Sequence, residues 1–195
     1  MRGFDALSVP DISQYRTLRD LGYEVAAGYT RALTIEAIAE ALGLGMAVLP
    51  ILEAGSPTDI TYFTPAQGTA DGQRFVAWAQ SVGMPRGFPF VGVPLDFDIS
   101  ASVMVPTIAD YANALNDAVA GRNPDWLYGP YDAIEAAKAW GGIAGFMQAQ
   151  AADWSGGRNA QPHPCADIVQ VGGSTIAGLQ LDIQVVRTGA RMWRV

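Results

Sequence analysis

The stretch YEVAAGYTRALTIEAIAEALGLGMAVLPIL, residues 23–52, carries the pattern that decides the fold. Its first seven residues, Tyr23–Tyr29, predict a strand, and Met46–Leu52 is almost entirely apolar, as expected of a strand covered on both faces. Between them Thr34 opens a segment whose apolar residues recur at helical spacing, and Gly43 helps to end it. This strand–helix–strand order predicts a βαβ unit with parallel strands and a right-handed crossover.

The same alternation extends in both directions along the chain. Before this unit we expect a strand at Gly3–Ser8 and a helix from Asp11 through Gly22. After it the predicted elements are a helix with its core at Gly72–Val82, a strand at Phe90–Asp98, a helix at Thr107–Val119, a strand at Trp126–Gly129, a helix at Asp132–Trp140, and strands at Gly145–Gln150, Asp167–Val171 and Leu179–Val186. Residues 153–165 are predicted to be a loop without helix, and Gly172-Gly173 is predicted to be a turn.

These elements predict an α/β fold with five βα units followed by three strands that have little helix between them. Eight strands favour a closed, TIM-like barrel over an open doubly wound sheet. The glycine-rich phosphate fingerprint of a dinucleotide fold is missing, because the first strand is followed by Ser8-Val9-Pro10-Asp11. We find no repeat or linker, and therefore assign a single domain over residues 1–195.

Composition narrows the classes of function. The chain has 195 residues, of which 50% are hydrophobic and 16% charged, so it is not a disordered chain. Its net charge is −7, whereas a nucleic-acid binder or a polybasic membrane dock needs a basic surplus. No apolar run reaches the roughly 18–20 residues of a membrane helix. We therefore expect neither a nucleic-acid partner nor a membrane.

The chain has one cysteine, Cys165, and one histidine, His163. This excludes an internal disulfide and a tetrahedral Cys/His zinc site. A Ser-His-Asp or Cys-His enzyme would have to use His163, which lies in a proline-rich stretch where an exposed loop histidine is the simpler interpretation. We expect no metal and no cofactor, so any chemistry must rest on carboxylates.

Acidic residues recur where a barrel collects its functional groups, at the carboxyl ends of strands. Asp5 lies on the first strand, Glu53 follows the third, and Asp182 lies on the eighth. Because the first and eighth strands of a barrel are neighbours, Asp5 and Asp182 are expected to approach each other across the closing seam.

Asp96 and Asp98 form the sharpest signal, in Val93-Pro94-Leu95-Asp96-Phe97-Asp98. Alternate residues of a strand share a face, so both carboxyls are predicted to point into the barrel mouth, roughly 6.5–7 Å apart at Cβ. Crowded carboxylates separate one another's pKa values, as glycoside hydrolysis requires of its proton donor and its anion. The alternatives are an Asp-x-Asp cap of the next helix and a cation site.

Aromatic and amide side chains accompany these acids. Tyr29 and Tyr128 lie at predicted strand ends, where a ring can stack on a sugar. Gln148 and Gln170 end two further strands, where amides can bond sugar hydroxyl or acetamido groups. Packing and barrel filling remain the alternative roles for all four.

The order of several short motifs resembles a known family. The motifs are Gly3-Phe4-Asp5, Leu95-Asp96-Phe97-Asp98, Phe146-Met147-Gln148 followed by Asp153-Trp154-Ser155-Gly156-Gly157, and Leu181-Asp182-Ile183. Together they resemble the glycoside-hydrolase-like barrel domain of unknown function that is common in actinobacteria and their phages. The layout is similar to that of the family 25 lysozymes.

The resemblance implies a muramidase-like, retaining hydrolase of bacterial cell-wall glycan. By position Asp98 corresponds to the lysozyme general acid and Asp96 to the residue that stabilises charge or orients an acetamido group, while Asp5 and Asp182 line the pocket floor. Tyr29, Glu53, Tyr128, Gln148 and Gln170 complete the candidate substrate-binding set. The lysozyme pattern has a Glu where this chain has Asp98, which is one methylene shorter, and a misplacement of about 1 Å can cost on the order of a hundredfold in rate.

This departure leaves two other functions open. One is a glycan-binding or structural module of a phage virion, with phage proteins or further copies of the chain as partners. The other is a metal-binding barrel that uses Asp5, Asp96, Asp98 and Asp182. The N-terminus carries no export signal, so we expect the protein to reach the cell wall on a virion or by release from the cytoplasm.

Overall fold

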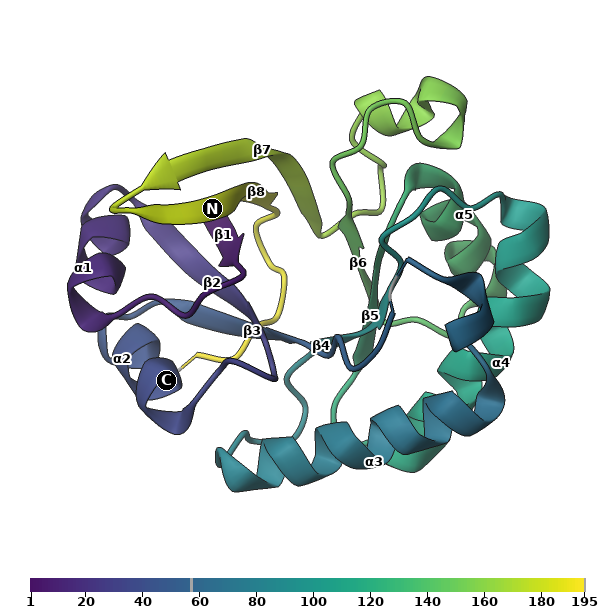
Figure 1. Ribbon diagram of the computed structural model, residues 1–195, viewed down its shortest axis with the longest axis horizontal. Coiled ribbons are helices and arrows are strands. Elements are labelled where there is room, and N and C mark those ends of the chain that lie inside the picture. The colour runs from purple at the N-terminus through teal and green to yellow at the C-terminus, as the bar shows by residue number, and fades with distance from the viewer. Residues whose placement is uncertain (57, 195) are drawn as a thin grey trace.

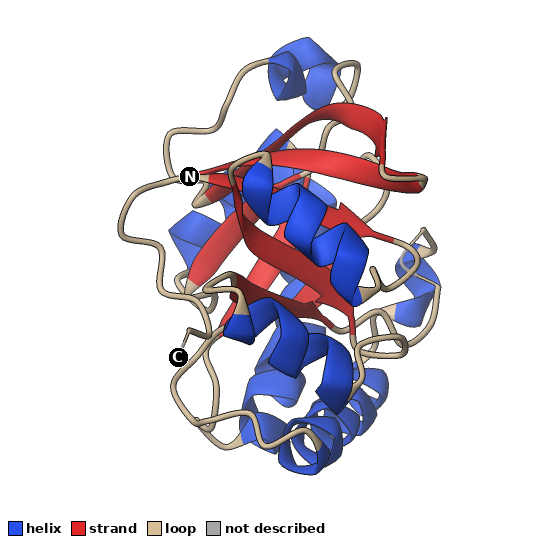
Figure 2. Ribbon diagram, turned by 90° about the vertical axis from the view of Figure 1, so that its left-hand side faces the viewer, coloured by secondary structure: helices blue, strands red, loops and turns tan. Residues whose placement is uncertain are grey.

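The computed structural model is a closed eight-stranded barrel surrounded by helices (Figures 1 and 2). It describes residues 1–56 and 58–194. The elements follow the order β1 (Arg2–Ala6), α1 (Ile12–Asp20), β2 (Tyr23–Tyr29), α2 (Ile35–Gly43), β3 (Ala47–Ile51), η1 (Ile60–Tyr62), α3 (Pro65–Ser81), β4 (Phe90–Pro94), α4 (Ala101–Val119), β5 (Asp125–Gly129), α5 (Tyr131–Trp140), β6 (Gly145–Gln148), η2 (Ser155–Ala160), β7 (Ile168–Ile176) and β8 (Leu179–Val186). An α/β barrel is the fold class that the sequence predicted.

Strands β1 to β7 pair in parallel in chain order. Strand β8 runs antiparallel to both β7 and β1 and so closes the barrel. The reversal is possible because a two-residue turn, Ala177-Gly178, joins β7 to β8. Both turn residues have positive φ, 52° and 79°, as a type I′ hairpin turn requires.

The predicted turn at Gly172-Gly173 is wrong. Both glycines lie within β7, where Gly172 pairs with Ile183 and Gly173 with Asp182. The register shifts between Gln170 and Gly172, so one residue of β7 is unpaired in a bulge. The glycine pair marks this bulge, and the hairpin therefore extends farther than the sequence pattern indicated.

Strand β4 is shorter than predicted, and this correction matters for the site. It ends at Pro94 instead of Asp98. Past Pro94 one backbone hydrogen bond to β5 remains, from the Leu95 N–H to Tyr128 O (2.8 Å), and the chain then leaves the sheet. Asp96 and Asp98 therefore lie in the connection to α4, and the rule that alternate strand residues share a face does not apply to them.

Three helical boundaries also differ from prediction. Helix α3 begins at Pro65, where Thr64 caps it by accepting from the Gln67 N–H, so proline occupies a position that needs no hydrogen bond. Helix α4 begins at Ala101 and contains Pro106, which the sequence pattern took as a boundary. The loop after β6 contains η2, two short 3₁₀ turns that meet at Gly156 and Gly157.

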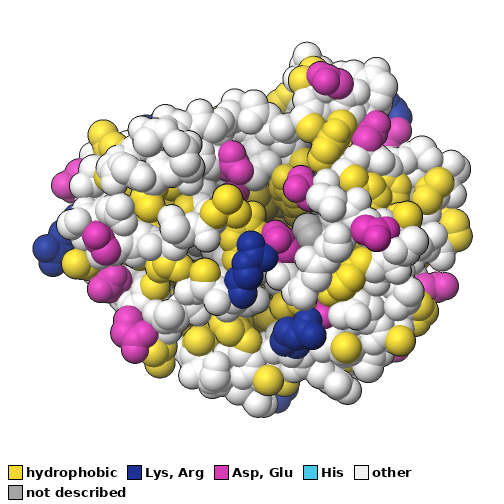
Figure 3. Space-filling model, in the orientation of Figure 1, with side chains coloured by type: hydrophobic (Ala, Val, Ile, Leu, Met, Phe, Trp, Pro, Cys, Tyr) yellow, Lys and Arg dark blue, Asp and Glu magenta, His cyan; other side chains and the backbone are white. Residues whose placement is uncertain are grey.

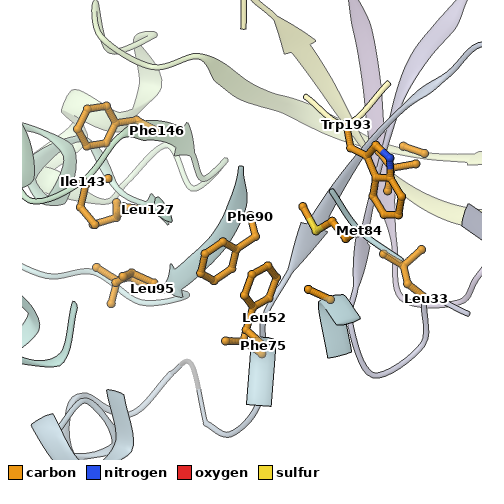
Figure 4. Close-up of a cluster of buried hydrophobic side chains, with 14 of the residues drawn as sticks. Leu33, Leu52, Phe75, Met84, Phe90, Leu95, Leu127, Ile143, Phe146 and Trp193 are labelled. Atoms are coloured by element: carbon orange, nitrogen blue, oxygen red, sulfur yellow. The ribbon is translucent and has the colours of Figure 1, made fainter. Parts of the chain in front are cut away.

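Two apolar clusters hold the fold together. One fills the lower barrel with side chains such as Val25, Leu49 and Trp126. The other lies between the barrel and its helices, where the rings of Phe75 (α3) and Phe90 (β4) stack with centroids 3.6 Å apart (Figure 4). Within the barrel, the pocket described below lies at the mouth.

Candidate functional site

A pocket of about 210 Å³ opens at the carboxyl ends of the parallel strands. Its lining consists of Asp5, Leu7, Tyr29, Ile51, Glu53, Pro94, Asp96, Tyr128, Met147, Gln170 and Asp182. Seven of these are residues that the sequence analysis proposed for the site. In Figure 3 acidic side chains surround a central hollow on this face, with basic side chains beside them.

Asp5 forms the floor of this pocket, and its side chain is almost fully buried. Asp5 Oδ2 accepts hydrogen bonds from Gln170 Nε2 (3.0 Å) and Gln184 Nε2 (2.6 Å). Burial raises the pKa of Asp5 to about 6; the two amide hydrogen bonds oppose this rise, and the charges of Asp182 and Asp96 add to it. Asp5 therefore holds its proton at a higher pH than an ordinary aspartate does.

Gln170 connects Asp5 to the pocket wall. Its Oε1 accepts from the Tyr128 hydroxyl (3.1 Å) and from the Gln150 N–H (3.1 Å), while its Nε2 donates to Asp5. Tyr128, Gln170 and Asp5 therefore form one hydrogen-bonded chain across the floor. Such a chain fixes the orientation of each polar group before a ligand arrives.

Asp96 and Asp182 come from opposite sides of the barrel. In the closed order of strands, β8 lies diametrically across from β4, after which Asp96 follows. Burial raises the pKa of Asp182, and the Asp96 charge raises it further. Burial and the Glu53 charge raise the pKa of Asp96, while a hydrogen bond from Tyr128 opposes the rise. Two facing carboxyls of this kind take up protons one after the other.

Glu53 sits at the rim and is paired with a cation. Its Oε1 accepts from Arg31 Nη1 at 2.8 Å, and the Arg31 guanidinium lies 4.8 Å from the centroid of the Tyr29 ring. Burial, followed by the charge of Asp5, raises the pKa of Tyr29, so its hydroxyl remains a neutral donor. Together these contacts place Tyr29 as a fixed wall of the pocket.

Asp98 does not line this pocket, contrary to prediction. It lies in a separate, open hollow with Asp59, Phe97 and Ser100, and its Oδ1 accepts from the Ser155 N–H at 2.9 Å. The strand ends too early to aim Asp98 at the barrel axis. Its carboxylate instead holds the start of η2.

Gln148 is also outside the pocket, because the loop that follows uses its whole amide. Its Nε2 donates to Gln161 O (2.9 Å) and Asn159 Oδ1 (3.2 Å), and its Oε1 accepts from the His163 N–H (2.6 Å). Gln148 is fully buried in this arrangement. It fixes residues 155–165 against the barrel and has no donor left for a substrate.

His163 is buried, so the expected exposed loop histidine is wrong. Its Nε2 lies 2.7 Å from Glu135 Oε1, and its Nδ1 accepts from the Cys165 N–H at 3.0 Å. Burial lowers the pKa of His163, although Glu135 opposes this. One ring nitrogen is occupied by helix α5 and the other by the loop, and the ring does not line the pocket.

Sequence reasoning missed some residues that shape the site. Gln184 was detectable, because it stands two positions after Asp182 and shares its face of β8. Leu7, Ile51 and Met147 line the pocket as apolar surface, and no pattern separated them from ordinary barrel residues. Arg31 carries no motif, and only the fold brings it to Glu53.

Other kinds of site were also tested within residues 1–56 and 58–194. There, no three His, Cys, Asp or Glu side chains gather closely enough to hold a metal ion, so the metal-barrel alternative is not supported. Nor does any described helix combine the length and hydrophobicity needed to cross a membrane.

A family model described as "Rv2525c-like, glycoside hydrolase-like domain" matches residues 17–186. The chain belongs to this family. The resemblance stated from the motifs is thereby confirmed, and the fold around the pocket is that of a glycoside hydrolase-like domain. Among curated proteins no match was found.

Solved structures share the fold at low sequence identity. The Tat-secreted protein Rv2525c of Mycobacterium tuberculosis superposes with a TM-score of 0.78 at 18% identity, over 97% of this chain and 98% of that one. An uncharacterised B. stearothermophilus protein gives 0.66 at 17% identity, over 96% of both chains. A muramidase from Acremonium alcalophilum gives 0.53 at 11% identity, over 97% and 95%.

Proposed function

We propose that this protein is a retaining glycoside hydrolase that acts on bacterial cell-wall glycan. The observation that carries the proposal is the pair Asp96 and Asp182, which reach one sugar-sized pocket from opposite walls of the barrel. Glycoside hydrolysis needs two carboxyl groups that flank the bond to be cut. Membership of a glycoside hydrolase-like family and the muramidase-like fold support the choice of reaction and substrate.

The two carboxyls take different roles because their environments differ. Burial raises the pKa of both, but the Tyr128 hydroxyl lowers the pKa of Asp96, whereas no such contact in the described structure lowers that of Asp182. We therefore assign Asp182 as the proton donor and Asp96 as the anion. Asp182 gives its proton to the glycosidic oxygen as that bond breaks, and Asp96 attacks the anomeric carbon to form a glycosyl–enzyme ester. Water, deprotonated by Asp182, then cleaves the ester and restores both groups.

The remaining pocket residues bind the sugar and set the charge of the pocket floor. Asp5, which pairs directly with Asp182 across β1 and β8, keeps its proton up to a pH of about 6 and so limits the negative charge on the floor below that pH. Tyr29 and Tyr128 offer ring faces and hydroxyls to a neutral sugar, and Gln170 is held in one orientation between them and Asp5. At about 210 Å³ the pocket is smaller than the roughly 300–1,000 Å³ of common small-molecule sites, in keeping with a single sugar ring.

The direct experiment measures new reducing ends released from purified peptidoglycan. Wild-type protein is expected to release them, and Asp96→Asn and Asp182→Asn are each expected to lose on the order of 10²–10⁴-fold in rate. Asp98→Asn is the matched control, because asparagine still accepts from the Ser155 N–H. If wild-type protein and the two pocket variants release reducing ends equally, the hydrolase proposal is wrong.

A second candidate function is glycan binding without turnover, as in a virion module. It is favoured by the position of Asp98, since the residue aligned with the lysozyme general acid lies outside the pocket. Retention of the protein on purified cell walls, with no reducing ends released over several pH values, would support this function. Assembly of the chain into particles or symmetric oligomers would strengthen it.

A further inference from the structure

A second hollow adjoins the pocket on the β2–β3 side. It has a volume of about 430 Å³ and is lined by Thr30, Arg31, Glu53, Ala54, Gly55, Arg74 and Trp78. Glu53 belongs to the linings of both spaces, so the two are contiguous at the rim. A chain of sugars that leaves the pocket on this side enters the hollow.

The two spaces differ in charge. The described lining of the pocket carries four carboxyls, Asp5, Glu53, Asp96 and Asp182, and no basic side chain. The lining of the hollow includes two guanidinium groups, Arg31 and Arg74, which are paired with Glu53 and Asp71 respectively. An anion is therefore repelled less in the hollow than in the pocket, and the hollow offers it guanidinium donors.

Both guanidinium groups are anchored by one nitrogen and remain open on the others. Arg31 Nη1 donates to Glu53 Oε1 at 2.8 Å, and Arg74 Nη1 donates to the buried Asp71 Oδ1 at 2.7 Å. Among the residues that the structure describes, no hydrogen bond uses the Nε or Nη2 atoms of either group, and the two side chains are 52% and 53% exposed. Guanidinium groups that are held in place but still have free N–H donors are suited to binding carboxylates through paired hydrogen bonds.

The hollow also has an apolar wall for a sugar ring. Trp78 is half-buried there, and its indole N–H donates to Leu33 O at 3.4 Å, which fixes the ring on α3. An aromatic wall beside two cations matches a pyranose that carries an acidic group. Neither feature serves the reaction at Asp96 and Asp182.

We infer that this hollow is a subsite for an acidic sugar, which places a carboxylate on Arg31 and Arg74 while the neighbouring neutral sugar occupies the pocket. The inference rests on the proposed function and specifies its substrate class: a glycan in which neutral and carboxylate-bearing units alternate. The carboxylate can belong to a lactyl ether or to a uronic acid, since both present the same anion to the arginines.

The test compares ligands that differ only in charge. A hyaluronan tetrasaccharide and its methyl ester, together with a N-acetylglucosamine–N-acetylmuramic acid disaccharide with a free lactyl group, are titrated calorimetrically into wild-type protein. Neutral triacetylchitotriose is titrated in parallel to report on saccharide binding that needs no charge, and a glycerol phosphate oligomer reports on phosphate. We expect the carboxylates to bind roughly tenfold or more tightly than the ester, and this preference to fall with salt.

Variants test whether the preference for the carboxylate over its ester arises in the hollow. Arg74→Gln, at a residue that does not line the pocket, is expected to weaken the preference for the carboxylate and to leave triacetylchitotriose affinity within about twofold. Arg31→Gln with Arg74→Gln is expected to abolish the preference. Arg86→Gln, at an exposed arginine of the α3–β4 loop, is the charge-matched control and should retain the preference.

The outcomes separate the two proposals. If triacetylchitotriose binds but wild-type protein does not distinguish acid from ester, or the double variant keeps the preference, the subsite inference is overturned and the proposed function stands. Tighter binding of the phosphate oligomer than of the carboxylates also overturns it. If no saccharide binds and no reducing ends appear, both proposals fail.

Discussion

Asp5 and Asp182 are directly opposite each other in the antiparallel pair of β1 and β8 that closes the barrel. Residues so paired point to the same face, with Cβ atoms about 4.5–5.5 Å apart. Two carboxyls at this distance repel each other when both are ionised, which is one reason why the pKa of Asp5 is raised. Repulsion between Asp5 and Asp182 therefore lowers the stability of the folded protein when both are ionised, and this effect can be measured.

Replacing Asp5 with Asn should stabilise the protein at neutral pH. Because the folded-state pKa is about 6 and the ordinary value 3.8, the folded protein holds this proton while the unfolded chain releases it between about pH 4 and 6. The free energy of unfolding of wild-type protein thus falls as the pH rises through this window, by about 3 kcal/mol at most. Asp5→Asn lacks this loss. Urea denaturation at pH 4 and pH 7.5 should show a gain only at the higher pH, and an equal effect at both pH values would contradict the assignment.

The rate of hydrolysis should depend on pH through two carboxyls. Activity needs Asp96 ionised and Asp182 protonated, so kcat/KM should fall at low pH as Asp96 gains its proton and at high pH as Asp182 loses one. Since the pKa of each is raised, both limbs should lie above the ordinary carboxyl range. A profile of kcat/KM that stays flat from pH 4 to 8 would exclude these roles.

Asn159 should be essential for docking η2 on the barrel. Its Nδ2 donates to Ala149 O (2.8 Å) and Ala151 O (2.9 Å), and its Oδ1 accepts from the Tyr131 N–H (2.8 Å) at the start of α5. Asn159→Ala leaves these buried groups without partners and should lower the free energy of unfolding by about 2–4 kcal/mol.

Gln161 provides the control for this variant. Gln161 is exposed, and its hydrogen bonds in the described structure come from its backbone: the carbonyl accepts from Gln148 Nε2, and the N–H donates to Arg158 O (3.1 Å). Gln161→Ala should change stability by less than about 0.5 kcal/mol. Equal urea midpoints for the two variants would show that the side-chain contacts of Asn159 are not what holds the loop.

Replacement by alanine should change the stability of the protein in opposite directions at two helical glycines. A Cβ on Gly68 of α3 would lie 2.2 Å from Tyr111 O of α4, so Gly68→Ala should separate the two helices and cost about 1–3 kcal/mol. Nothing described lies within 4 Å of the corresponding position at Gly43 of α2, where alanine should stabilise by up to about 1 kcal/mol. Thermal denaturation of both variants tests the pair, and a stabilising Gly68→Ala would disprove the close packing.

The local pattern of the chain was sufficient for the barrel and for part of the site. Apolar runs such as Met46–Leu52 and helices capped by Asp11 and Thr34 depend on neighbouring residues alone, so periodicity and capping chemistry predict them. The approach of Asp5 to Asp182 followed from closure of the barrel, and the register of β1 with β8 confirms it.

The sequence predictions that were wrong concern residues whose positions depend on where the pairing between strands ends. Pro94 ends β4 and turns Asp98 toward Ser155, and the bulge beside Gly172 lengthens the β7–β8 hairpin. The positions of Gln148 and His163 likewise depend on distant contacts, because their side-chain partners in the loop and in α5 lie 11 to 28 residues away. No local spacing reports such contacts.

The sequence by itself thus determined an acidic α/β barrel, because strand and helix periodicities and a count of carboxyls are properties of short segments. Only the tertiary structure decided which carboxyls share the pocket and that two arginines stand beside it. The reason is physical: a side chain's direction at the end of a strand depends on the last hydrogen bond of the ladder, and its pKa and partners depend on elements that only closure of the barrel brings together.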